Sequence, residues 1–177
     1  MPAISKSDCG HSIRSGDAKK LGKFVTRGYF GKIPPDQLKI ANGLIFFKAD
    51  GRKRGVSPKR TKSVVGGYNA ENGVLTIIQY NKSTAISTDI NQLCKIQKNP
   101  FEGDVVNAYN DGPLEDRRKI GSFYEPETSS PPVFLSSGKS IFYEHRTFHL
   151  VGDESQLGQI SEALLGVGVR ATKSAFE

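Results

Sequence analysis

Three neighbouring segments decide the fold class of this chain: GDVVNAYNDGP at residues 103–113, SFYEPETSSPPVFLSSGKS at 122–140 and IFYEHRTFHL at 141–150. Each holds short runs of aromatic and β-branched residues between Gly, Pro, Asn and Ser, which is typical of β-strands joined by turns. The same segments also carry amide, carboxylate and imidazole groups. Because a polar group in a strand must face water or line a site, the search for a functional site begins here.

Strand-like runs recur along the rest of the chain at short spacing. The strands are expected at residues 44–48, 63–68, 74–80, 93–97, 104–109, 120–125, 133–135 and 140–150. Asn72–Gly73 between two of these runs is a strong hairpin signal. The pattern therefore predicts an all-β fold, an antiparallel β-sandwich of about eight to ten strands.

One C-terminal α-helix is expected over residues 154–165. Asp153 can cap it, and Gln156 stands at the third helical position as the reciprocal partner. Leu157, Ile160, Leu164 and Leu165 then form an apolar stripe at helical spacing, and Gly166 and Gly168 end the helix.

The two ends of the chain are poor in large apolar residues. We expect residues 1–23 to be a flexible N-terminal arm, residues 24–169 to be the β-sandwich domain with its C-terminal helix, and residues 170–177 to be a frayed tail. A short helical turn is expected at residues 21–25 or 35–38.

The net charge of +7 is concentrated in one segment. Its basic residues are Lys48, Arg52, Lys53, Arg54, Lys59, Arg60 and Lys62. Such a cluster can bind nucleic acid or another acidic partner, and it also fits a solvated hairpin loop. No aromatic residue interleaves the basic ones, so we expect only weak, sequence-independent binding of nucleic acid.

The cysteines and the first residues bear on the cellular compartment. Cys9 lies in the arm and Cys94 in an expected strand, so they predict no disulfide framework and a cytoplasmic location. The start of the chain has no apolar centre of the kind found in secretory signals, and no membrane contact is expected. No Cys/His spacing suits zinc, and no Gly-rich phosphate loop is present, so we expect no metal and no cofactor.

The chain resembles the galactose mutarotase-like (aldose 1-epimerase-like) superfamily. The resemblance lies in RGYFGKIPPDQLKIANGLIFFKADG at 27–51, SPKR at 57–60, GGYNAENGVLTIIQYN at 66–81, IQKNPFEGDVVNAYNDGP at 96–113 and the two segments that run from 122 to 150. It is most similar to an uncharacterised bacterial family of that superfamily. The chain corresponds to the C-terminal part of the usual length, has Cys94 where an aromatic residue is expected, and contains no Trp.

The resemblance implies a truncated mutarotase-like sandwich that binds a sugar or sugar-like ligand. In such enzymes a glutamate just before a short segment ending in Pro is the base, and Glu127 in Glu-Thr-Ser-Ser-Pro matches it. The N-terminal half that this chain lacks would hold the central histidine of true epimerases. An epimerase activity is therefore a weaker implication than ligand binding.

The residues themselves suggest further site members. Mutarotation needs a general acid beside the base, and His145 can serve as one. His149 lies on the same strand face as His145 but about 13 Å away, so the two cannot share a metal ion. Glu125 is about 7 Å from Glu127 on the same face; the alternative for both glutamates is a solvated edge.

Five more residues are candidates for the binding of a ligand. Asn107, Asn110 and Asp111 form a polar cluster, although Asn-Asp-Gly-Pro is also an ordinary turn. Tyr124 can lie under a sugar ring, and so can Tyr143, but both can equally be core residues. Arg146 faces away from the two histidines.

A shortened sandwich should leave sheet surface or a strand edge uncovered, which favours a homodimer. Three classes of function therefore remain open at this stage. They are a carbohydrate-binding domain, a basic module for acidic partners, and a non-catalytic oligomeric scaffold.

Overall fold

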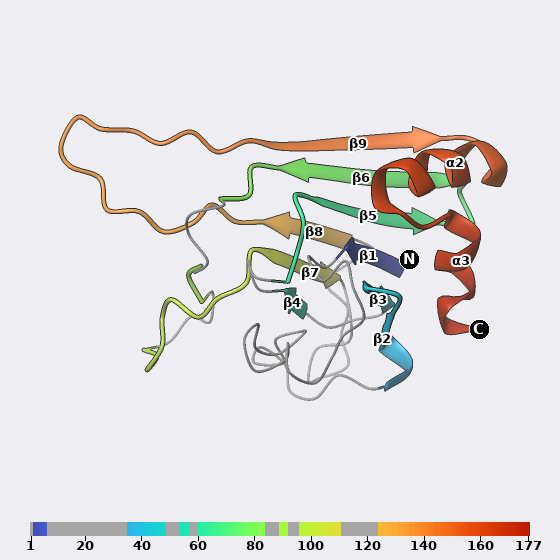
Figure 1. The fold of residues 1–177 in the computed structure, drawn as a ribbon, viewed down its shortest axis with the longest axis horizontal. Coiled ribbons are helices and arrows are strands. Elements are labelled where there is room, and N and C mark those ends of the chain that lie inside the picture. The colour runs from blue at the N-terminus through green and yellow to red at the C-terminus, as the bar shows by residue number, and fades with distance from the viewer. Residues whose placement is uncertain are drawn as a thin grey trace.

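The fold is strand-rich, with antiparallel sheets and a few short helices at the C-terminus (Figure 1). A computed structural model describes residues 2–6, 35–48, 54–56, 60–83, 89–91, 96–110 and 124–177. The described strands are β1 (Pro2–Lys6), β2 (Leu38–Ala41), β3 (Leu44–Lys48), β4 (Arg54–Val56), β5 (Val64–Asn69), β6 (Val74–Tyr80), β7 (Val106–Asn110), β8 (Tyr124–Thr128) and β9 (His145–Val151). The described helical elements are η1 (Pro35–Gln37), α2 (Glu154–Leu165), α3 (Val169–Lys173) and η2 (Ser174–Phe176).

The described strands form two sheets. The larger sheet has six strands in the order β2-β3-β1-β5-β6-β9, and the smaller has three in the order β4-β7-β8. All of these strand pairs are antiparallel. The expected strand-rich, antiparallel character is therefore confirmed for the described residues.

Tight turns set the register of the larger sheet. The turn between β5 and β6 contains Gly73 with a φ of 57°, and the Asn69 side chain accepts hydrogen bonds from the N–H groups of Glu71 and Asn72. The turn between β2 and β3 contains Asn42 and Gly43, both with positive φ. Positive φ at both central residues gives a turn whose twist matches that of the two strands, and Asn and Gly tolerate it best.

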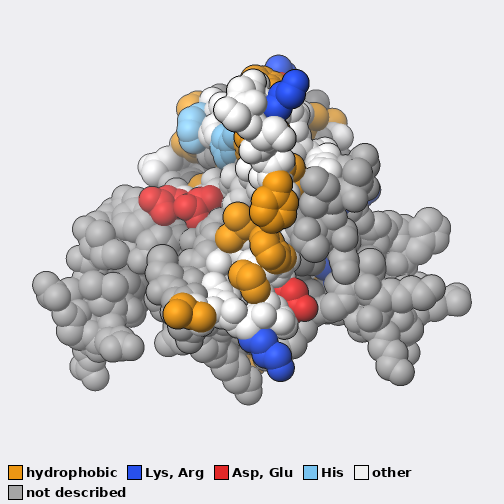
Figure 2. All heavy atoms as spheres, turned by 90° about the vertical axis from the view of Figure 1, so that its left-hand side faces the viewer, with side chains coloured by type: hydrophobic (Ala, Val, Ile, Leu, Met, Phe, Trp, Pro, Cys, Tyr) orange, Lys and Arg blue, Asp and Glu red, His pale blue; other side chains and the backbone are white. Residues whose placement is uncertain are grey.

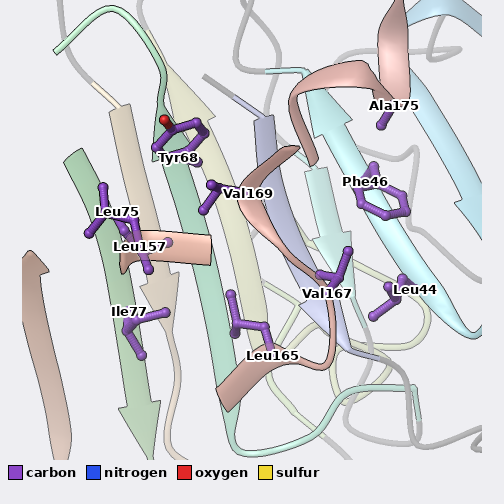
Figure 3. Packing of buried hydrophobic residues seen from close by; sticks show 10 residues of the cluster. All are labelled: Leu44, Phe46, Tyr68, Leu75, Ile77, Leu157, Leu165, Val167, Val169 and Ala175. Atoms are coloured by element: carbon purple, nitrogen blue, oxygen red, sulfur yellow. The ribbon is translucent and has the colours of Figure 1, made fainter. Parts of the chain in front are cut away.

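One face of the larger sheet packs against the C-terminal helices (Figure 3). The buried residues of this cluster are Leu44, Phe46, Tyr68, Leu75, Ile77, Leu157, Leu165, Val167, Val169 and Ala175. The strand members lie two residues apart in each strand, as strand alternation requires. Helix α2 and the segment after it therefore supply the apolar cover for this face.

The other face of the larger sheet shares a core with the smaller sheet. That cluster contains Ile45 and Phe47 of β3, Val65 of β5, Ile78 and Tyr80 of β6, and Val105, Val106 and Ala108 in or beside β7. Consecutive residues of β3 and β6 thus serve opposite cores. The six strands separate two apolar layers, one capped by helices and one by the three-stranded sheet.

The start of α2 confirms the predicted cap. Asp153 has an extended backbone, and its carboxylate accepts a hydrogen bond of 2.8 Å from the Gln156 N–H. Gly166 ends the helix with a left-handed backbone. The bounds of α2 equal those expected from the stripe of leucines, because cap and stripe agree at both ends.

The two chain ends differ from the expected flexible segments. Residues 2–6 form β1 between β3 and β5, whereas residues 7–23 lie outside the described part of the chain. Residues 170–177 are also ordered rather than frayed: α3 and η2 bury Thr172 and Ala175. Both misjudgements have one physical reason, since short segments with few apolar residues are ordered here by pairing and packing rather than by their own composition.

Several expected strands are shorter than the sequence indicates. Residues 140–144 do not join β9, and residues 133–135 are not a strand. Of the strand expected at 93–97, residues 92–95 lie outside the described residues and 96–97 are irregular. The segment 120–125 is described only from Tyr124, where β8 begins. No described helix is long and apolar enough to cross a membrane.

The contact between β5 and α2 gives a stability prediction. A Cβ added to Gly66 would lie 2.4 Å from Cδ1 of the buried Leu165. We therefore expect Gly66→Ala to lower the free energy of unfolding by about 1–3 kcal/mol, because the packed leucine must move. Urea unfolding followed by circular dichroism measures this change.

Gly158→Ala is the matched control for this substitution. Its added Cβ would meet Val169 Cγ2 at an ordinary 3.8 Å, and alanine is a better helix former than glycine. We expect Gly158→Ala to raise the free energy of unfolding by about 0.5–1 kcal/mol. Equal effects of the two substitutions would contradict the close packing of α2 on β5.

Candidate functional site

A row of polar side chains lies on one face of β9. His145, Thr147 and His149 are opposite Tyr80, Ile78 and Thr76 of β6, and directly opposed residues of antiparallel strands share a face. Since Ile78 and Tyr80 belong to the core under the smaller sheet, the row faces the same side. All three members are nevertheless exposed. We call His145, Thr147 and His149 the β9 ledge.

Hydrogen bonds join the ledge to the end of β8. The Tyr143 hydroxyl donates to Thr128 Oγ1 over 2.8 Å, and Thr128 Oγ1 lies 2.6 Å from His145 Nδ1. His145 Nε2 in turn lies 3.0 Å from Thr147 Oγ1. Both ring nitrogens of His145 thus face hydroxyl groups, which fix the plane of the imidazole. These hydrogen bonds also connect the two sheets, because Thr128 ends β8 and His145 begins β9.

The second histidine of the ledge is held by β6. His149 Nδ1 lies 3.0 Å from Thr76 Oγ1, and Thr76 is almost fully buried. One ring nitrogen is therefore engaged by a buried hydroxyl. The two exposed imidazoles share a face, as expected from their spacing.

Glu127 lies on the other face of the smaller sheet. It is opposite Asn107 of β7, and the neighbours of Asn107 in β7, Val106 and Ala108, point into the core between the sheets. Strand alternation therefore directs Asn107 and Glu127 away from that core, whereas Thr128 contacts His145. The register brings Glu127 and Asn107 together and separates Glu127 from the ledge.

Asn107 is fully buried on that outer face. Its Nδ2 donates to the Asp104 backbone carbonyl over 3.4 Å. Asp104 itself is almost completely buried. Asn107 thus has a structural role in the smaller sheet, because its side-chain amide bonds to the backbone just before β7.

The other predicted site residues have varied places. Glu125 is exposed and shares the face of Glu127, two residues along β8. Asn110 and Tyr124 are directly opposed at the end of the β7–β8 ladder, but only their backbone is described. Asp111 lies outside the described residues.

Asp89 is a buried carboxylate that the sequence does not single out. Its side chain is 2% exposed, and its Oδ1 accepts a hydrogen bond of 2.7 Å from the Ile90 N–H. Burial raises the pKa of Asp89 to about 6. Burial also raises the pKa of the Tyr143 hydroxyl, and the charge of Asp89 adds to that rise. The charge of Asp89 therefore acts on the Tyr143 hydroxyl, which donates the hydrogen bond to Thr128.

The basic segment is only partly a surface feature. Arg60 is fully buried, so it cannot belong to an exposed basic patch, and its inclusion there is corrected. Lys48 is exposed and Lys62 half-buried; the Lys62 carbonyl accepts a hydrogen bond of 2.6 Å from the Tyr80 hydroxyl. Arg54 begins β4 and its side chain is not described, while Arg52, Lys53 and Lys59 lie outside the described residues.

A pocket of about 350 Å³ opens at the β5–β6–β9 end of the larger sheet. Its polar lining consists of Ser63, Gln79, Asn81, Glu144 and Arg146, with Leu164 of α2 as an apolar wall. Glu144 and Arg146 form an ion pair. None of the predicted site residues lines this pocket. Among the described residues, no group of three or more His, Cys, Asp or Glu side chains could hold a metal ion.

The buried carboxylate predicts a pH dependence of stability. Between pH 3.8, the ordinary pKa of Asp, and about 6, the folded protein keeps a proton that the unfolded chain has released. The free energy of unfolding should therefore fall as pH rises through that window, by on the order of 2–3 kcal/mol from this group, and stay low above it.

Asp89→Asn removes this effect while it keeps an acceptor for the Ile90 N–H. We expect the variant to exceed the wild type in stability at pH 7 and to approach it near pH 4, measured by urea unfolding at several pH values. Asp36→Asn, at an exposed carboxylate, is the control. A constant difference between Asp89→Asn and wild type across pH 4–7 would contradict the raised pKa.

Comparison with known proteins gives one family. The sequence model of a family of unknown function, DUF6786, matches residues 12–176. No curated protein and no solved structure matches the chain. The match extends over most of the chain, including the C-terminal helices and every described strand except β1, and the chain therefore belongs to the DUF6786 family.

Proposed function

We propose that this chain is a mutarotase-like carbohydrate-binding domain whose ligand lies on the β9 ledge. The ligand class is a sugar or a similar polyhydroxylated small molecule. The observation that supports the proposal most directly is the ledge itself. Two imidazoles and a threonine hydroxyl stay exposed on a face whose neighbouring strands are covered.

The chemistry of the ledge suits a polyhydroxylated ligand. The His149 ring nitrogen that does not face Thr76 and the Thr147 hydroxyl can both donate or accept a hydrogen bond, depending on tautomer and rotamer. His145, whose two ring nitrogens face Thr128 and Thr147, orders the Thr147 hydroxyl. These side chains are held 3.0 Å or less from their partners, which lowers the entropy cost of ordering them on binding. Tyr143 is half-buried beside them and offers an aromatic ring next to the ledge.

The arrangement favours binding over epimerisation. Glu127, the residue that matches the base of mutarotase-like enzymes, points away from the face that carries His145. A ligand hydroxyl would also have to replace Thr147 at Nε2 before His145 could exchange a proton with it. Because Glu127 and His145 face different ways and both His145 ring nitrogens already have partners, the proposed function is ligand binding without catalysis.

The shared core supports the sandwich architecture in this proposal. Buried residues of β3, β5 and β6 pack with Val106 and Ala108 of β7. Two antiparallel sheets that pack face to face through alternate residues are typical of a β-sandwich. In the proposed architecture the larger sheet extends past the smaller one, and the uncovered face of β9 is the binding surface.

NMR titration with D-galactose and D-glucose tests the proposed site. His145→Ala and His149→Ala should each raise the Kd by about tenfold or more, because a ligand in a polar site depends on a few well-placed hydrogen bonds. Arg146→Ala is the matched control, since Arg146 is exposed on the opposite face of the same strand. It should leave the Kd unchanged.

The same titration can overturn the proposal. Equal losses of affinity in Arg146→Ala and His145→Ala would place the ligand elsewhere, and no binding at saturating sugar would remove carbohydrate from the function. Polarimetry of freshly dissolved galactose is the second readout. If the protein accelerates mutarotation and Glu127→Gln abolishes this, the chain is an enzyme and the restriction to binding is wrong.

A further inference from the structure

The outer edge of β9 and the segment before it form one exposed surface. β9 is the last strand of the larger sheet. It follows an extended segment, residues 129–144, that leaves the sheets after β8 and returns as β9 (Figure 1). We call residues 129–144 the extension. Its turn has a hydrogen bond of 3.0 Å from the Lys139 N–H to the Ser136 carbonyl and a positive φ at Gly138.

The extension carries large apolar side chains in water. Its exposed hydrophobic residues are Val133, Phe134, Leu135, Ile141 and Phe142. Phe134 is 99% and Phe142 80% exposed. Figure 2 shows hydrophobic side chains gathered along the middle of the face toward which the extension points. A contiguous apolar surface of this kind is typical of an interaction site.

Two backbone hydrogen bonds, one at each end of β9, fix which of its backbone groups face outward. The Asn81 N–H donates to the Glu144 carbonyl, and the Gly152 N–H donates to the Gly73 carbonyl. In an antiparallel ladder such pairs alternate along the strand. The even-numbered residues from 144 to 152 therefore direct their backbone groups to β6. His145, Thr147, His149 and Val151 direct theirs to the open edge.

This edge is complementary to itself. A two-fold axis at Phe148 places Thr147 opposite His149 of a second copy and His145 opposite Val151, so that all four outward-facing residues find partners. Arg146 then faces Leu150, and no like charges are opposed. An axis at Arg146 would instead oppose two guanidinium groups. The pairing about Phe148 thus makes the most backbone hydrogen bonds and also avoids repulsion between like charges.

The two ends of β9 are complementary as well. The extension precedes β9, and a groove of about 580 Å³ between α2 and α3 follows it. Gly158 and Ala163 line the groove together with Glu154, Glu162 and Arg170, and Arg170 Nε donates to Glu154 Oε1 over 2.9 Å. Antiparallel pairing of two β9 strands puts the extension of one copy beside the helices of the other. Residues 138–144 extended span about 20 Å and α2 about 18 Å, so their lengths agree.

We propose that two copies of this chain form a two-fold dimer in which the β9 strands pair and each extension lies in the α2–α3 groove of the other copy. The apolar side chains of the extension leave water against Gly158 and Ala163. Lys139 at its turn is attracted by Glu162 of the groove, since Glu154 is already paired with Arg170. The occupant is a second copy because β9 matches itself in register and because groove and extension are at opposite ends of it.

Analytical ultracentrifugation of the full chain tests the dimer. We expect twice the monomer mass at micromolar concentration. Phe148→Lys would oppose two ammonium groups on the axis and should raise the dimer Kd by about tenfold or more. Phe101→Lys is the matched control, because Phe101 is 48% and Phe148 42% exposed and Phe101 lies outside β9, the extension and the groove. The control should leave the Kd unchanged.

A second variant tests the extension separately. Phe134→Asp together with Phe142→Asp should also raise the dimer Kd by about tenfold or more; both side chains are so exposed that neither change disturbs the core. A monomer at high micromolar concentration would overturn the proposal, as would a dimer that Phe148→Lys leaves intact. A dimer that is weakened by Phe148→Lys but not by the paired aspartates would overturn the docking of the extension.

Discussion

The larger sheet depends on one constraint: consecutive residues of its central strands must satisfy two different apolar layers. In β3, Leu44 and Phe46 face the helices while Ile45 and Phe47 face the smaller sheet. A shift of one residue in register would exchange these sets and move every side chain to the wrong layer. The turns at Asn42–Gly43 and Gly73 hold the register, and the packing of both layers follows from it.

The same alternation decides which polar groups can act together. Neighbouring residues of β8 point to opposite sides, so Thr128 contacts His145 while Glu127 is opposite Asn107. Two residues that are close in any sequence motif can therefore belong to separate surfaces. The ledge on β9 is polar because the smaller sheet does not cover it. Its histidines keep their orientation through threonine hydroxyls rather than through carboxylates.

Strand geometry also separates the side chains of β9 from its backbone groups at the open edge of the larger sheet. Side chains of His145, Thr147 and His149 form the ledge, and the backbone groups of the same residues face the open edge. A ligand on the ledge and a strand at the edge would thus meet the same three residues in different directions.

Local sequence patterns were enough to predict the strand-rich character, the bounds of α2 and the shared face of the two histidines, because these follow from periodicity and from the cap at Asp153. They did not reveal β1, the ordered C-terminal tail or the burial of Arg60, since each depends on contacts with distant residues. Asp89 carried no local signal either, because its raised pKa comes from burial alone. The pairing of distant strands directs Glu127 away from the core between the sheets, whereas His145 is on the side of the larger sheet that faces this core. The register between β7 and β8, and the layer that covers each side, are properties of strand pairing and not of any single segment.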